Sequence, residues 1–163
     1  MLMTAMTAFQ TLGHINLMVR DVEASTRFYE KFGFKPFLQL TEEDHTPWIV
    51  YLRLDDMTYL ELMRGGTGRA PGRNMAGVHH FCITVSDIEQ AVAQLEAGGI
   101  KLPKPLSLKR NADKNRGTML EDPDGNLIEL MEMSPDCIQY EAIKAFKAGE
   151  GRTSIVHPTA SST

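Results

Sequence analysis

Two stretches of similar sequence decide the fold: residues 12–21, LGHINLMVRD, and residues 78–87, VHHFCITVSD. Aligned with each other, they place His14 on His80 and Asp21 on Asp87. In each stretch apolar residues alternate with others as in a strand, and the closing aspartate is a residue type that begins helices. The chain is therefore expected to be a duplication of one structural unit.

The sequence that follows each stretch predicts the same elements twice. A helix is expected after Asp21, ending at Gly33, and another after Asp87, ending at Gly98. Strand-like runs then cover residues 34–40, 49–54 and 59–63 in the first half and 100–108, 117–121 and 126–133 in the second. Residues 122–125, Asp-Pro-Asp-Gly, form a strong turn signal between the last two strands. Each half is predicted to be a β-α-β-β-β module, which makes the fold class α+β.

These patterns also predict the domain boundaries. The first module is expected over residues 10–64 and the second over residues 77–133. Residues 65–76 are rich in Gly and Arg and are predicted to be a linker. A C-terminal amphipathic helix is expected over residues 134–150, and the Ser/Thr-rich residues 151–163 are expected to be a flexible tail.

Composition favours small-molecule chemistry. The 163-residue chain has a formal net charge of -4, which gives no electrostatic reason to bind nucleic acid or an acidic membrane surface. It contains no apolar run long enough to span a membrane and no signal peptide is expected. Its two cysteines lie in different contexts, so a disulfide framework is not expected and the cytoplasm is the predicted location.

Strand alternation predicts that one histidine and one glutamate of each half lie on the face of the sheet opposite the apolar, core-facing residues. Ile15 and Leu17 form the apolar side of the first strand, so His14 lies on the other side. The same alternation selects His80 over its neighbour His79, which is expected on the helix side. The two glutamates, Glu61 and Glu129, each lie between leucine or isoleucine residues that are expected to pack in the core.

These four side chains are candidate metal ligands: His14, Glu61, His80 and Glu129. A lone strand histidine is usually structural, but the same His and Glu recur in both halves, 47 and 49 residues apart. Two imidazoles and two carboxylates suit a borderline or hard divalent ion, with Ni, Co, Zn, Mn and Fe(II) as candidates. Such an ion would polarise a substrate oxygen and stabilise an enediolate, with a loosely held glutamate as the base.

The chain resembles the vicinal oxygen chelate superfamily, which includes glyoxalase I. The resemblance covers residues 12–133 and is carried by Gly13-His14, by YLEL at residues 59–62, by His80 and by EDPDGNLIEL at residues 121–130. It implies paired βαβββ modules whose curved mixed sheet forms a metal cup, commonly in a homodimer. It also implies a lactoylglutathione lyase-type reaction on a small oxygenated substrate, in which Glu61 and Glu129 are the catalytic residues: both bind the metal and Glu129 serves as base.

Other members of the superfamily remain alternatives. Glyoxalase I usually has an arginine and an asparagine for glutathione where this chain has Met18 and Gly65, so the thiol stays open. Methylmalonyl-CoA epimerase resembles the second module but usually has glutamine in place of Glu61. Non-heme iron extradiol dioxygenases and fosfomycin-resistance enzymes use three protein ligands. A non-catalytic protein that sequesters a ligand in the same cup is the alternative from a different class.

Two further features have open roles. Basic residues cluster before the 117–121 strand and are interpreted either as a solvated surface loop or as an anion-binding mouth: Lys109, Arg110, Lys114 and Arg116. Cys82 is expected on the same face as His80, where a small buried thiol is favoured over a ligand or nucleophile. The sequence also leaves open whether a metal site is built within one chain or between two.

Overall fold

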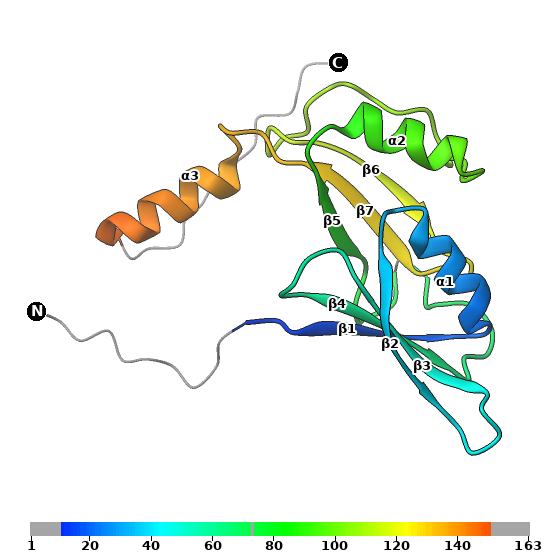
Figure 1. Ribbon diagram of the computed structural model, residues 1–163. Helices are drawn as coiled ribbons and strands as arrows, with labels where there is room; N and C mark the ends of the chain where they lie inside the picture. Colours follow the sequence, from blue (N-terminus) through cyan, green and yellow to red (C-terminus); the bar gives the residue numbers. More distant parts are fainter. Residues whose placement is uncertain (1–10, 73, 151–163) are drawn as a thin grey trace, which may run out of the picture. The chain divides into compact units, whose positions relative to one another are not determined.

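The computed structural model describes residues 11–72 and 74–150 of the chain. It divides into two compact units, with the division between Gly68 and Arg69. Each unit contains one β-sheet and a helix that follows its first strand (Figure 1). The predicted α+β fold class is confirmed. The boundaries proposed for the modules and linker stay predictions, and the predicted flexible tail, residues 151–163, lies outside the described residues.

The first unit has the β-α-β-β-β order that its sequence predicts. Its elements are β1 (His14–Val19), α1 (Val22–Glu30), β2 (Lys35–Thr41), β3 (Pro47–Arg53) and β4 (Tyr59–Arg64). The sheet order is β1-β4-β3-β2, with β1 parallel to β4 and the other pairs antiparallel. Strand β4 therefore lies between β1 and β3, so a residue of β4 has a neighbour on each side.

Helix α1 begins where the sequence predicts because Asp21 caps it. The Asp21 carboxylate accepts a hydrogen bond from the backbone N–H of Ala24 at 2.9 Å, which satisfies one of the free donors of the first turn. Beyond the helix, Gly33 has φ +95°, a conformation that favours glycine. The helix packs on β3 and β4 and buries Val22 and Tyr29 against the sheet.

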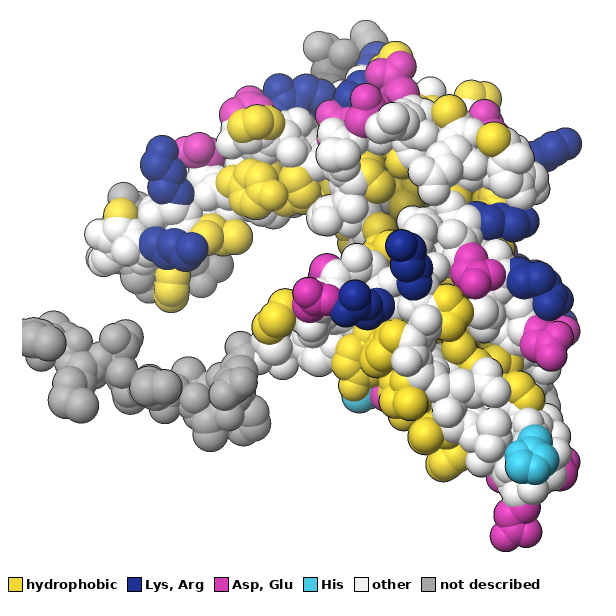
Figure 2. Space-filling model, in the orientation of Figure 1, with side chains coloured by type: hydrophobic (Ala, Val, Ile, Leu, Met, Phe, Trp, Pro, Cys, Tyr) yellow, Lys and Arg dark blue, Asp and Glu magenta, His cyan; other side chains and the backbone are white. Residues whose placement is uncertain are grey.

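Side chains on one face of this sheet form the core of the first unit. The core-facing residues of β1, β3 and β4 are largely or fully buried: Leu17, Val19, Val50, Leu52, Leu60 and Leu62. Strand β2 lies at the edge, and all seven of its residues are exposed. Phe37 of β2 and Trp48 of β3 are 50% and 41% exposed. Figure 2 shows apolar side chains on the surface of this sheet.

The second unit repeats this plan with one strand fewer. Its elements are β5 (Phe81–Val85), α2 (Ile88–Ala97), β6 (Arg116–Glu121) and β7 (Leu127–Glu132). The sheet order is β5-β7-β6, with β5 parallel to β7 and β6 antiparallel to it. Asp87 caps α2 as Asp21 caps α1, since its carboxylate accepts from the backbone N–H of Gln90 at 2.9 Å. Strands β5, β7 and β6 thus correspond to β1, β4 and β3.

The strand predicted over residues 100–108 is wrong. Within the part of the chain that the structure describes, residues 101–115 form neither strand nor helix. Pro103 and Pro105 explain the failure, because each lacks the backbone N–H that a strand needs for its ladder. The second unit therefore has no counterpart of β2 among its described residues.

The predicted turn before the last strand is confirmed. The Asp122 carboxylate accepts hydrogen bonds from the backbone N–H groups of Asp124 at 2.9 Å and Asn126 at 2.8 Å. Gly125 has φ +87°, which the tight reversal requires. The turn sets the β6–β7 register and with it the position of Glu129 opposite Met119.

A short C-terminal helix follows the second sheet. Helix α3 (Ile138–Ala145) continues into a π-helical segment, Phe146–Glu150. Its first turn is attached to the preceding loop, because the Ile138 N–H donates to the Asp113 carbonyl at 3.2 Å and the Gln139 amide donates to the Asp113 carboxylate at 2.9 Å. None of the helices in the described ranges is long and apolar enough to cross a membrane.

Candidate functional site: two histidine–glutamate pairs

In the first unit the structure brings His14 and Glu61 together. The Nε2 atom of His14 lies 3.5 Å from Oε2 of Glu61, although the two residues are on different strands. The parallel pairing of β1 with β4 creates this contact, because it aligns Asn16 with Glu61 and leaves His14 one step away on the same face. The Glu61 side chain is only 12% exposed, whereas that of His14 is 42% exposed.

The second unit contains the equivalent pair. The Nε2 atom of His80 lies 3.1 Å from Oε2 of Glu129. His80 immediately precedes β5, and β5 is parallel to β7 as β1 is to β4. His79 is exposed instead of packing on the helix side as predicted, because it lies before β5, where strand alternation does not apply. Its Nδ1 forms a hydrogen bond with Nδ1 of His80 at 2.8 Å. The ring of His79 therefore supports that of His80.

Burial agrees with the predicted faces of both glutamates. Leu60 and Leu62 are 3% and 0% exposed, while Glu61 between them is partly accessible. Ile128 and Leu130 are 0% and 1% exposed, and Glu129 again lies between buried neighbours. Each carboxylate therefore projects from the face of the sheet opposite the buried leucines.

The donor types and spacing within each pair fit a shared divalent cation. Nitrogen and oxygen ligands at about 2.1 Å from a metal lie roughly 3.0 Å apart in an octahedral arrangement and roughly 3.4 Å apart in a tetrahedral one. The observed separations of 3.1 Å and 3.5 Å fall close to these values. Among the residues that the structure describes, however, no group of three or more His, Cys, Asp or Glu side chains has metal-binding spacing. Each pair alone would supply two ligands.

The two glutamates have different neighbours. Glu61 lies between Asn16 of β1 and Tyr51 of β3 in the strand register, and the Asn16 side-chain amide donates a hydrogen bond to Glu61 Oε2 at 2.9 Å. Glu129 occupies the same place in the second sheet between two sulfur-containing residues, Cys82 of β5 and Met119 of β6. Sequence alternation placed Asn16 and Cys82 on this face, but only the strand register identifies Tyr51 and Met119 as the opposite neighbours.

The environment of Cys82 keeps its thiol protonated at neutral pH. Burial raises the pKa of Cys82 to about 11, and the charge and hydrogen bonding of the Glu129 carboxylate add to the increase. A protonated thiol is a poor nucleophile and a poor metal ligand. Cys82 is exposed, so the expected buried thiol is wrong, whereas its protonated state argues against a role as ligand or nucleophile.

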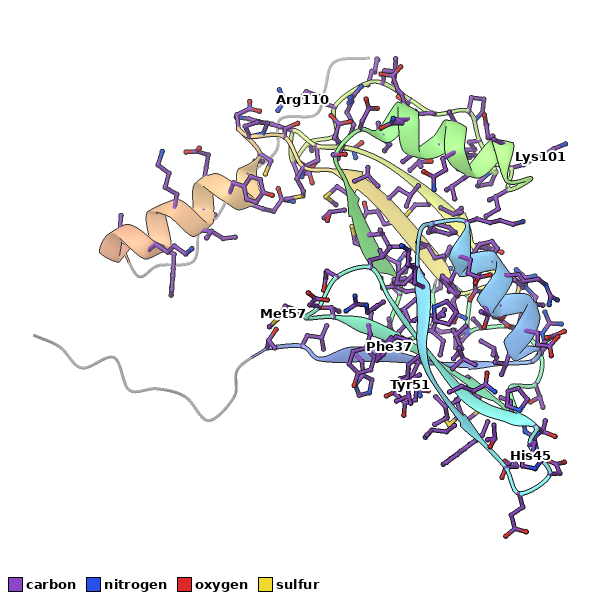
Figure 3. The ribbon with its side chains drawn as sticks, viewed as in Figure 1. Phe37, His45, Tyr51, Met57, Lys101 and Arg110 are labelled. Carbon is purple, nitrogen blue, oxygen red and sulfur yellow. The ribbon has the colours of Figure 1, made fainter. Side chains whose placement is uncertain are left out.

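Aromatic side chains extend the face beside the first pair. The Tyr59 ring stacks on the His14 imidazole with centroids 5.2 Å apart. Phe37 and Tyr51 complete a cluster with Tyr59, with mutual centroid distances of 5.7 to 6.0 Å. Figure 3 shows Phe37 and Tyr51 side by side on the β2–β3 hairpin. Burial raises the pKa of Tyr51, and the nearby Glu61 and Tyr59 contribute.

The basic loop is largely committed to ion pairs. Arg110 and Lys114 both pair with Asp136. Arg116 binds Glu132 at 2.6 Å and Glu89 at 3.3 Å on the side of the sheet that carries α2. These contacts favour the interpretation as a surface loop over an anion-binding mouth, because three of its four cations already have acidic partners.

Known proteins with related sequences or folds include enzymes. The lactoylglutathione lyase of Schizosaccharomyces pombe is 28% identical over 150 residues, covering 76% of this chain and 47% of that enzyme, so the chain spans about half the length of this relative. A glyoxalase family protein from Enterococcus faecalis has the same fold, with a TM-score of 0.65 and 26% identity over 77% of this chain and all of that one.

A third similar protein was solved with a metal ion. The fosfomycin resistance protein FosX of Listeria monocytogenes, in complex with Mn(II) and a dihydroxypropylphosphonic acid, gives a TM-score of 0.60 at 19% identity. The likeness covers 78% of this chain and 96% of the FosX chain and shows a shared fold. The family model described as the Glyoxalase/Bleomycin resistance protein/Dioxygenase superfamily matches residues 11–130, most of the sequence, and this chain belongs to that superfamily, as its resemblance predicts.

Proposed function

We propose that the protein is a metal-dependent lyase or isomerase of glyoxalase I type that acts on a small oxygenated substrate by proton transfer. The observation that supports it most is the repeated His–Glu pair, His14 with Glu61 and His80 with Glu129, at ligand spacing in both units. In this proposal the two pairs bind one divalent cation, drawn from Ni, Co, Zn, Mn and Fe(II). The pairs come from one chain or from the two chains of a homodimer.

The residues of the chain divide the chemistry between them. When bound, the cation would polarise a substrate oxygen and lower the barrier to removing the proton of the adjacent carbon. Glu129 would take that proton, leaving the substrate as an enediolate, and, once its carboxyl proton has exchanged with solvent, would deliver a proton to the neighbouring carbon. His14, Glu61 and His80 would hold the cation. Since one substrate carbon is oxidised while its neighbour is reduced, no redox partner is needed.

We do not expect glutathione to be the thiol of the substrate. Met18 and Gly65 occupy the positions where glyoxalase I usually carries its residues for glutathione. Met18 is 56% exposed and presents no charge to a glutathione carboxylate. A hemithioacetal of another small thiol is therefore the preferred substrate.

We also propose that the protein acts in the cytoplasm. The free thiols of Cys82 and Cys137 support this location, because they suit a reducing compartment.

The test combines metal content with solvent exchange. Purified protein loaded with Co²⁺ or Ni²⁺ is incubated in D₂O with the hemithioacetals that methylglyoxal forms with glutathione and with 2-mercaptoethanol. We expect about one metal ion per His14–Glu61–His80–Glu129 set and deuterium in the product carbon. Glu129→Gln should abolish the exchange, whereas Glu43→Gln, the same change at an exposed hairpin residue, should not. Exchange that survives Glu129→Gln would refute the base assignment.

A second candidate is a protein that sequesters an apolar ligand without turnover. The aromatic cluster of Phe37, Tyr51 and Tyr59 supports it, because aromatic faces bind flat ligands by stacking. This candidate predicts no stoichiometric metal and a binding signal with a planar aromatic probe that Phe37→Ala weakens. An epimerase would instead exchange the α-proton of an acyl thioester such as methylmalonyl-CoA, and a dioxygenase would consume oxygen with Fe(II).

A further inference from the structure

The two half-sites use equivalent positions for different side chains. Asn16 and Cys82 each follow the pair's histidine by two residues, and each is the parallel-strand partner of the pair's glutamate. The two positions are therefore equivalent in the strand register, so a side chain of the same length is expected to reach the glutamate from either one. What differs is the hydrogen-bonding capacity of the two residues.

Asn16 restrains the carboxylate of Glu61. Its amide donates to Oε2, the same oxygen that faces His14 Nε2, at 2.9 Å. An amide N–H is a strong donor, and a bond to a carboxylate fixes the plane of the acid group. With Tyr51 directly opposite on β3, Glu61 lies between two side chains that carry polar groups, and its position is well defined.

Glu129 has a weaker donor beside it, because the Cys82 thiol takes the place of the Asn16 amide, while His80 Nε2 lies 3.1 Å from its Oε2 atom. Its partners across the strands are Cys82 and Met119, whose sulfur atoms are weak hydrogen-bonding groups. Beside it on β6, Gly117 has no side chain, and a Cβ built there would lie 3.6 Å from Glu129 Oε1. The Asn111 Nδ2 atom would lie at the same 3.6 Å from that Cβ, so any other residue at position 117 would crowd both Asn111 and Glu129.

We propose that Asn16 and Cys82 are positioning residues that make the two glutamates unequal: Asn16 locks Glu61 as a permanent ligand, and Cys82 leaves Glu129 free to leave and rejoin the cation. This inference rests on the proposed function and adds the residues that divide its roles. Neighbours that orient a ligand contribute about 10- to 100-fold to metal affinity. A base that must move toward a substrate carbon cannot be held by a strong fixed donor.

The first experiment measures Co²⁺ binding by calorimetry and by the visible absorption of the bound ion. Asn16→Ala is expected to bind Co²⁺ about tenfold more weakly, and Asn16→Ser, which keeps a donor, to recover part of the loss. Met18→Ala is the matched control, because Met18 lies two residues farther along the same face and is exposed. Wild-type affinity in Asn16→Ala would overturn the assignment for Asn16.

The second experiment installs the same restraint in the other half-site. Cys82→Asn should keep or strengthen Co²⁺ binding and should lower the rate of deuterium exchange at least about tenfold with KM unchanged. Thr84→Ala, two residues farther along the same face of β5, is the control and should exchange like the wild type. An unchanged exchange rate in Cys82→Asn would overturn the assignment for Cys82.

The two proposals fail in different ways. If wild-type protein binds Co²⁺ and exchanges deuterium but the variants at positions 16 and 82 match their controls, the positioning roles are wrong and the proposed function stands. If wild-type protein binds no Co²⁺, the proposed function fails and the positioning roles fail with it. Thermal unfolding of each variant by circular dichroism shows whether lost binding reflects lost structure.

Discussion

Nε2 of His80 and Oε2 of Glu129 lie 3.1 Å apart although 49 residues separate them in sequence. The parallel pairing of β5 with β7 produces this approach, and the parallel pairing of β1 with β4 produces the corresponding one between His14 and Glu61. A duplicated module thus builds the same His–Glu pair twice. Under the proposed function, binding of a cation requires both pairs, because two ligands leave most of a coordination sphere unfilled.

Loss of a single histidine should therefore weaken metal binding far more than loss of a neighbouring residue. We expect His80→Ala to reduce Co²⁺ affinity by more than about 100-fold, beyond the effect of an outer-shell neighbour. His45→Asn is the control, since His45 lies at the tip of the β2–β3 hairpin and asparagine tolerates its φ of 66° (Figure 3). Calorimetric titration with Co²⁺ decides the matter, and equal affinities for the two variants would exclude His80 as a ligand.

The Cys82 thiol should react slowly in spite of its exposure. Because burial and Glu129 raise its pKa to about 11 from 9.0, its thiolate fraction at pH 8 is about one-hundredth that of an ordinary thiol. Iodoacetamide labelling of metal-free protein, followed by peptide mass spectrometry, should show this lag. Glu129→Gln should speed the labelling by removing the carboxylate charge. Labelling of Cys82 at the rate of a free peptide thiol would contradict the prediction.

The attachment of α3 should weaken in acid. Burial raises the pKa of Asp113, but hydrogen bonds from Gln139 and Asn115 outweigh this effect and leave the pKa below its usual range. A lowered pKa means that the carboxylate stabilises the fold above its unfolded pKa, about 3.9, and that this contribution is lost as pH falls through the lower folded value. The protection factors of the amides of residues 138–145, which correct for the slower intrinsic exchange in acid, should therefore fall below about pH 4.

The same attachment can be tested by mutation at neutral pH. Asp113→Ala removes the acceptor for Gln139 and Asn115 and should increase proteolytic cleavage within α3 about tenfold. Asp136→Ala is the control, because Asp136 is a more exposed acid, just before α3, that pairs with Arg110. Equal cleavage of both variants would show that Asp113 does not hold the helix.

Gly66 should be intolerant of any side chain. A Cβ built there would lie 2.9 Å from the Met18 carbonyl oxygen and 2.9 Å from the Val19 carbonyl carbon, both backbone atoms of β1. Gly66→Ala should therefore force the chain away from β1 and lower the free energy of unfolding by about 1–3 kcal/mol. Gly13→Ala, with nothing within 4 Å of its Cβ, should change it by less than about 0.5 kcal/mol. Urea unfolding of both variants provides the comparison, and similar midpoints would rule out the steric argument.

Local sequence was sufficient to predict most elements. Asp21 and Asp87 mark the starts of α1 and α2 because a capping carboxylate acts within three residues of its own position. Alternation placed Glu61 and Glu129 opposite the buried leucines, since successive strand residues point to opposite faces. The strand expected at residues 100–108 failed because apolar content was given more weight than the missing N–H groups of Pro103 and Pro105.

The sequence by itself determined that the chain is a duplication and that His14, Glu61, His80 and Glu129 share a type of face, because duplication and alternation are written in local order. The tertiary structure decided which groups touch. Register between strands far apart in sequence set Asn16 beside Glu61 and Cys82 beside Glu129. The register of β6 and β7 also places Arg116 opposite Glu132, with which it forms an ion pair. Such contacts depend on hydrogen-bonded pairing of distant segments, and no short-range pattern specifies which residue of one strand will lie opposite which residue of the next.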